Sequence, residues 1–113
     1  MIKRAALLIL CIAAQCASAQ VAVGTVKTIR GHDSTLWGPD SNFITVDGFT
    51  SAGSCATQDG LVTMTIRGDK LGDRQTAIAL LAKTTGKMVR VSVDPTFAGP
   101  GASCYLRWIE LAE

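Results

Sequence analysis

Residues 68–94 read GDKLGDRQTAIALLAKTTGKMVRVSVD and predict one helix that runs directly into one strand. Asp73 is a suitable N-cap, because its carboxylate can accept hydrogen bonds from the free N–H groups of a first helical turn. Gly86 stands where a helix would end on a left-handed residue. After Gly86 the apolar period changes from 3.6 to 2, and every second residue from 89 to 93 is a valine. The connection is short, so the helix and the strand are expected to be neighbours.

The predicted helix has two different faces. At 100° per residue, one side gathers the larger apolar residues and is expected to face a core. That side carries Ala77, Leu80, Leu81 and Thr84, with Ile78 at its margin. The opposite side carries Gln75, Ala79, Ala82 and Lys83. Its small alanines would let another backbone approach, so it is a candidate oligomer interface. The alternative is that these alanines are exposed residues of high helix propensity.

Residues 1–19 have the pattern of a signal peptide. Lys3 and Arg4 form a basic start, an apolar run follows, and residues 17–19 (ASA) match the small-residue pattern that a signal peptidase accepts. We therefore predict a signal peptide at 1–19 and one binding domain at 20–113, secreted or periplasmic after cleavage near Ala19. No apolar run is long enough for a permanent anchor, so no membrane insertion is expected.

The predicted mature chain has balanced charge. The whole sequence has 11 Lys and Arg against 9 Asp and Glu, and two of the basic residues lie in the segment 1–19. Nine residues of each sign remain. A chain without a basic excess is not expected to bind nucleic acid.

The cysteines predict a disulfide. Cys11 and Cys16 would leave with the signal peptide, so Cys55 and Cys104 have only each other in an oxidising compartment. A bond between them would stabilise the chain by up to about 4 kcal/mol in the loop-entropy model. Two buried free thiols or an intermolecular bond are the alternatives.

Alternating apolar residues predict four further strands, at 21–29, 42–49, 61–67 and 103–111. The first of them changes phase at Gly24, which indicates a bulge or a bend. Three strands, a helix and two strands follow one another, which is the order of a five-stranded OB barrel with a helix between its third and fourth strands. The predicted fold is therefore mainly β with one helix, in an OB-like barrel.

Few residues suit catalysis or metal binding. His32 is the only histidine, and oxidised cysteines would leave no zinc ligand set. His32, Asp33 and Ser34 are the residue types of a hydrolase triad, but consecutive side chains in a loop diverge. Asp and Ser in such a turn more often bind their own backbone. We expect no enzyme activity, no metal and no cofactor.

The loop at 31–41 (GHDSTLWGPDS) contains a candidate ligand site. An exposed indole can stack on a sugar ring while nearby polar groups bind its hydroxyls. The candidate residues are Trp37, Asp33, Ser34 and Asn42. The alternative is a tryptophan that folds down to complete a small core.

The run from Ala77 to Val93 (AIALLAKTTGKMVRVSV) follows the strand at 62–66 and precedes a strand bearing Cys104. This arrangement resembles the core of the binding subunits of subtilase-cytotoxin-like and pertussis-like AB toxins, and of many small uncharacterised exported bacterial proteins. The resemblance implies an OB fold, a homo-oligomeric ring whose helices line a central pore, and recognition of host glycans without catalysis. The sugar-pocket residues of those toxins have no matching motif in this chain, so none is carried over.

The sequence therefore favours an exported, non-catalytic binding module that recognises a glycan. One alternative is a module that binds another protein through an exposed apolar patch of Tyr105, Ile109 and Leu111. The least favoured alternative is a small hydrolase that uses His32.

Overall fold

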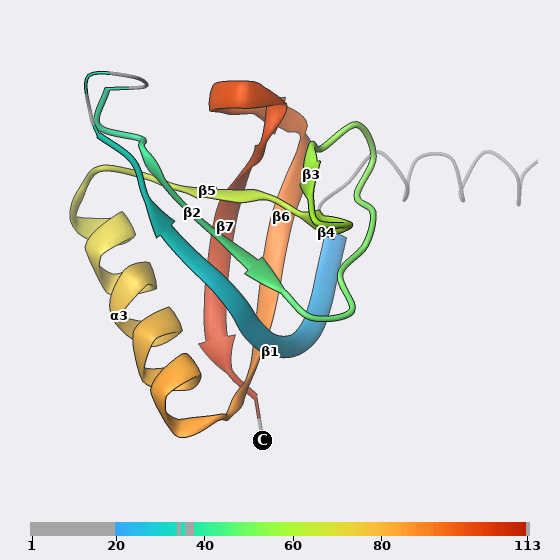
Figure 1. The fold of residues 1–113 in the computed structure, drawn as a ribbon, viewed down its shortest axis with the longest axis vertical. Coiled ribbons are helices and arrows are strands. Elements are labelled where there is room, and N and C mark those ends of the chain that lie inside the picture. The colour runs from blue at the N-terminus through green and yellow to red at the C-terminus, as the bar shows by residue number, and fades with distance from the viewer. Residues whose placement is uncertain (1–19, 34, 36–37, 113) are drawn as a thin grey trace, which may run out of the picture.

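The computed structural model describes residues 20–33, 35 and 38–112. The structure is mainly β with one long helix, as predicted, and the helix lies along one side of the strands (Figure 1). The elements are β1 (Gln20–Gly31), β2 (Asn42–Val46), β3 (Thr57–Gln58), β4 (Leu61–Val62), β5 (Met64–Ile66), α3 (Lys70–Thr85), β6 (Met88–Ala98), the 3-10 turn η1 (Pro100–Ala102) and β7 (Cys104–Leu111). The predicted signal peptide at 1–19 lies outside the described residues.

Five strands form one mixed sheet that closes on itself. They are hydrogen-bonded in the order β1-β2-β5-β7-β6, and β6 pairs again with β1. Every pairing is antiparallel except the parallel one between β5 and β7, which places Met64 beside Cys104. The element order departs from the predicted one, because β3 and β4 form an additional hairpin between β2 and β5. The predicted strand at 61–67 is accordingly split at Thr63.

Strand β1 closes the sheet by pairing with two different strands. Its first half (Gln20–Thr25) pairs with β6, and its second half pairs with β2. The strand curves strongly where its partner changes (Figure 1). A Cβ atom at Gly24 would lie 2.2 Å from the backbone oxygen of Asp47, so the curve needs glycine there. The predicted bend is therefore confirmed, and the register shift follows between Val26 and Thr28.

Helix α3 packs on the sheet with the face opposite to the predicted one. The predicted core residues Leu80 and Leu81 are 51% and 52% exposed. A Cβ atom at Gly72 would lie 1.6 Å from the carbonyl oxygen of Arg67, so the helix backbone lies too close to the sheet for large side chains. The buried residues of α3 are Gly72, Gln75, Ala79 and Ala82.

The predicted oligomer interface is therefore wrong for three of its four residues. Gln75, Ala79 and Ala82 are covered by the sheet of the same chain. Lys83 is exposed, and its Nζ donates a hydrogen bond of 2.9 Å to the carbonyl oxygen of Lys27. Small residues on this helix allow an approach within the chain rather than between chains.

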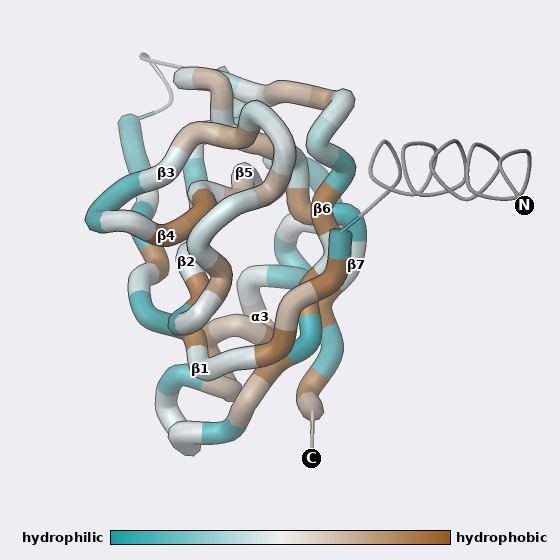
Figure 2. The backbone as a smooth tube through the Cα atoms, turned by 90° about the vertical axis from the view of Figure 1, so that its right-hand side faces the viewer, coloured by the Kyte–Doolittle hydropathy of each residue, from teal (hydrophilic) through white to brown (hydrophobic). Residues whose placement is uncertain are grey.

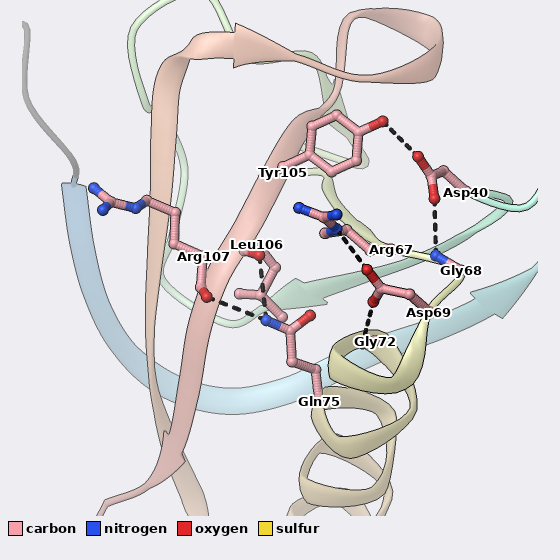
Figure 3. Close-up of polar contacts among 9 residues, drawn as sticks. All are labelled: Asp40, Arg67, Gly68, Asp69, Gly72, Gln75, Tyr105, Leu106 and Arg107. Carbon is pink, nitrogen blue, oxygen red and sulfur yellow. Dashed lines mark hydrogen bonds and ion pairs between the residues drawn. The ribbon is translucent and has the colours of Figure 1, made fainter.

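Gln75 fastens the helix to β7. Its Nε2 donates to the carbonyl oxygens of Leu106 and Arg107, both at 3.3 Å (Figure 3). The pairing of β5 with β7 ends at Tyr105, so β5 does not supply donors to these two carbonyls. Gln75 thus gives the buried carbonyl of Leu106 and the part-buried carbonyl of Arg107 a side-chain donor, while its own Oε1 is buried without a partner among the described residues.

The two ends of α3 are well capped. The N-cap is Asp69 and not the predicted Asp73, because the Asp69 carboxylate accepts from the N–H of Gly72 at 3.0 Å. Asp73 lies in the first turn, where a negative charge is favourable. Gly86 ends the helix in the left-handed region, with φ of 71°, as predicted.

The core lies inside the closed sheet. Figure 2 shows that the neighbouring strands carry hydrophobic stretches, drawn in brown. The largest apolar side chains with under 2% exposure are Ile44, Met64, Ile66, Leu106, Val46, Val62, Val89, Val91 and Val93. The valines that alternate over 89–93 are therefore buried, as the period of 2 predicts.

The predicted disulfide is also confirmed. Cys55 and Cys104 are bonded, with Cα atoms 5.3 Å apart. The bond ties the loop that follows β2 to the start of β7. In the described part of the chain, no helix has the length and apolar character needed to cross a bilayer.

Candidate functional site

The structure describes two of the four predicted ligand residues. Ser34 and Trp37 lie outside the described residues. The Asp33 carboxylate accepts from the backbone N–H of Thr35 at 2.9 Å, and this bond is the main cause that lowers the pKa of Asp33. Asp33 therefore binds its own turn. Asn42 is exposed at the start of β2, opposite Gly31.

His32 takes part in a cluster that covers Phe43. The two rings are stacked, with centroids 5.3 Å apart. The Arg30 guanidinium lies 5.5 Å from the centroid of the same Phe43 ring. Both groups lie against Phe43, which is 8% exposed and alternates with the inward Ile44. The described residues contain no group of three or more His, Cys, Asp or Glu side chains that could hold a metal.

A cleft opens beside the start of α3, where β5, β6 and β7 end or bend. It consists of two adjoining hollows of about 360 and 260 Å³. Arg67, Phe97 and Tyr105 line both hollows, and we call the whole the Arg67 cleft. Sites for small ligands commonly measure about 300–1,000 Å³. The remaining lining residues are Pro39, Asp40, Gly68, Asp69, Leu71, Asp94, Leu106 and Arg107.

One wall of the cleft is set by Asp40. Its Oδ2 accepts from the Tyr105 hydroxyl at 2.7 Å, and its Oδ1 accepts from the Gly68 N–H at 2.8 Å (Figure 3). Because the phenol donates to a carboxylate, ionisation of the phenol would lose this bond and place two negative charges together. The hydrogen bond to Asp40 therefore raises the pKa of Tyr105 above its usual value of 10.0.

The floor of the cleft is set by Asp69. One carboxylate oxygen caps α3 through Gly72, and the other accepts from the Arg67 Nε at 3.0 Å. The bond from Gly72 is the main cause that lowers the pKa of Asp69, and the positive charge of Arg67 adds to it. Among the described residues, no hydrogen bond uses the terminal amino groups of Arg67. Arg67 is thus held by one edge and offers the other to a ligand.

Aromatic rings form the third part of the cleft. Phe97 is 60% exposed, and its ring lies tilted against Tyr105 with centroids 5.0 Å apart. Phe97 belongs to the outer end of β6, within the irregular register between Val93 and Ala98. Asp94 stands at the start of this end, and hydrogen bonds from Thr96 lower its pKa. The end of β6 therefore carries an exposed ring beside a fixed carboxylate.

Sequence reasoning missed this cleft because four separate segments build it. Asp40, Arg67, Phe97 and Tyr105 come from the loop before β2, the end of β5, the end of β6 and the start of β7. One local feature is informative: Phe97 is a lone aromatic residue between Pro95 and the turn-forming run Gly99-Pro100-Gly101.

Comparison with known proteins finds no relative of this chain. No family model matches the chain, and neither a curated protein nor a solved structure does.

Proposed function

We propose that this protein is an exported, non-catalytic binding module that holds a glycan in the Arg67 cleft. The observation that carries the proposal is the exposed Phe97 ring, packed on Tyr105 beside groups that bind hydroxyls. A sugar ring has an apolar C–H face and a polar edge. The Phe97 face suits the former, and the charged groups suit the latter.

The polar groups of the cleft have capacity left for a ligand. Each oxygen of Asp40 and Asp69 accepts one hydrogen bond described above, and a carboxylate oxygen has a second lone pair. The free edge of Arg67 supplies donors. Three aspartates and two arginines line the cleft, so a ligand rich in phosphate is not favoured.

We also propose that the closed sheet is an OB-like barrel. With the β3–β4 hairpin set aside, the chain order is three strands, α3 and two strands, and the sheet order is β1-β2-β5-β7-β6. Export through a signal peptide at 1–19 remains a prediction. The Cys55–Cys104 bond supports it, because such bonds persist in oxidising compartments.

The test is a screen of immobilised oligosaccharides followed by calorimetric titration of the best one. Phe97→Ala should weaken binding by about tenfold or more, because it removes the main exposed stacking surface. Leu80→Ala is the matched control, since it also truncates a large exposed apolar side chain but lies outside the cleft. Absence of any bound oligosaccharide, or equal affinity of the Phe97 variant and the wild type, would contradict the proposal.

A second candidate function is the binding of a protein. The patch predicted for it does not exist as such, because Ile109 is buried inside the sheet and Tyr105 is bound to Asp40. Other apolar side chains are exposed together on the outside of the sheet. The homo-oligomeric assembly implied by the resemblance also remains a prediction, and its surface must differ from the buried face of α3.

A further inference from the structure

Apolar side chains gather on the outer surface of the sheet, where the first half of β1, β6 and β7 lie side by side (Figure 1). Directly opposite residues of antiparallel strands share one face of a sheet. The register therefore places two rows on this surface, which we call the sheet face: Val21, Ser92 and Trp108, then Val23, Arg90 and Glu110. Met88 follows beside Thr25.

The apolar members of the sheet face are well exposed. Trp108 is 40% exposed, and Val21, Val23 and Met88 are more so. The inward neighbours of these residues, Val89, Val91 and Val93, are fully buried. Strand β6 is therefore covered on one side by the core. On the other side it carries the exposed Met88 and Arg90, while Ser92, between Val21 and Trp108, is only 1% exposed.

An ion pair lies in the middle of the sheet face. The Arg90 Nη1 is 2.6 Å from the Glu110 Oε1, and the two side chains are 44% and 53% exposed. Such an exposed pair contributes little to the stability of one chain. It does give the face one positive and one negative group, side by side on β6 and β7 and flanked by Val23.

We propose that the sheet face binds the same face of a second copy of this chain. A two-fold axis parallel to the strands, between β6 and β7, places β6 of each copy over β7 of the other. Arg90 then lies opposite Glu110 of the second copy, and the reverse contact forms by symmetry. Two sheets that pack in this way keep their strands nearly aligned, which is a common arrangement of stacked sheets.

Charge complementarity selects a second copy over other partners. A surface of a single charge would meet either Arg90 or Glu110 unfavourably, and this includes an anionic membrane. The face is complementary to itself in charge, since the two-fold axis exchanges the two groups. Residues 20–113 contain equal numbers of acidic and basic residues, so two copies do not repel each other over long distances.

The experiment measures the mass of the purified protein in solution by sedimentation over a concentration series. The wild type is expected to dimerise. Arg90→Glu and Glu110→Arg should each weaken the dimer by about tenfold or more, because each variant alone opposes like charges. An equimolar mixture of the two variants should form a heterodimer, since the carboxylate introduced at position 90 of one chain then faces the guanidinium introduced at position 110 of the other.

The mixture separates the proposal from a purely structural role of the ion pair. Each variant has lost its internal pair, and mixing cannot restore it within either chain. Val23→Thr keeps a β-branched side chain of high strand propensity at an exposed position, so the variant should fold. Its hydroxyl should weaken the dimer by a few-fold. Leu80→Glu, on the outer face of α3, is the matched control and should leave the mass unchanged.

A wild-type monomer at every concentration overturns the proposal. So does a mixture that associates no better than its components, or an assembly that depends on Leu80 and not on Val23. None of these outcomes bears on glycan binding, because the Arg67 cleft shares no residue with the sheet face.

Discussion

Strand β7 makes two polar contacts of opposite character within three residues. At Leu106 and Arg107, its carbonyl oxygens accept from Gln75, which is 2% exposed beneath α3. At Tyr105, its side chain donates to Asp40 at the edge of the open cleft. The first contact is largely buried and joins α3 to β7. The second keeps a ring and unused lone pairs within reach of a ligand, so exposure rather than polarity distinguishes a site from a structural contact.

The largest effect on stability is expected at the disulfide, whose Cys104 precedes Tyr105. Replacing both Cys55 and Cys104 by Ser should lower the free energy of unfolding by up to about 4 kcal/mol, because the unfolded chain is no longer restrained. Denaturant unfolding measures the loss. Hydrogen exchange should show that amides near Tyr105 lose more protection than those of α3. Equal stability of the variant would mean that the bond does not hold the start of β7.

Removal of the Gln75 contact should cause the next largest loss of stability. Gln75→Ala removes the buried side-chain donor to the carbonyl oxygens of Leu106 and Arg107, so the free energy of unfolding should fall by about 1–3 kcal/mol. Glycan affinity should be unchanged, because Gln75 does not line the cleft. Arg74→Ala, an exposed position beside it, should stay within about 0.5 kcal/mol of the wild type. A Gln75→Ala variant with wild-type stability and no glycan binding would show that Gln75 serves the ligand site and not the fold.

Gln75 reaches β7 because α3 turns its face of small residues towards the sheet. This orientation can be tested by enlarging a buried side chain of α3 and truncating an exposed one. Ala79→Leu should destabilise the protein by about 1–3 kcal/mol, because the space between helix and sheet is filled. Leu80→Ala should change the stability by no more than about 0.5 kcal/mol. Thermal melting of the two variants decides the matter, and the opposite ranking would restore the helix face predicted from hydrophobicity.

The smallest effect is expected at the open contact. Tyr105→Phe should cost about 0.5–1.5 kcal/mol of stability at neutral pH, since it leaves Asp40 with its bond from Gly68. The raised pKa means that the neutral phenol is favoured in the folded state. This contribution is present below pH 10.0 and is lost as the pH rises through the higher folded-state pKa.

Alkaline titration followed by tyrosinate absorbance checks this last prediction. The chain has a single tyrosine, so the signal belongs to Tyr105 alone. Its midpoint should lie above 10.0 in the folded protein and return to the usual value when urea unfolds it. A midpoint below the usual value would show that Asp40 does not face the phenol.

The sequence was informative where a feature is local or has one possible partner. The valines at 89–93 alternate cleanly, Gly86 marks a helix end, and Cys55 has only Cys104 once the first nineteen residues are set aside. The face of α3 was predicted wrongly because leucine normally marks the buried side. Here the distance between backbones decides instead, and the residue that reveals it is Gly72.

The candidate site cannot be predicted from the sequence for a different reason. Asp40 and Tyr105 are far apart in sequence, and neither is unusual in its own segment. Their meeting depends on the parallel pairing of β5 with β7, which no local pattern encodes. Asp33 was chosen because polar residues surround Trp37, yet its carboxylate binds its own turn.

The shared use of β1 sets an order in which the molecule can be completed. Val21 pairs with Ser92, so β1 leaves a ribosome or a translocation channel well before its partner strand β6. Until then, half of β1 is an unpaired edge, able to join another chain. Contacts between such distant segments slow folding, and closure of the sheet is expected to limit its rate. The bend at Gly24 lets β1 close the sheet. The exposed edge that favours aggregation is removed only when this closure is complete.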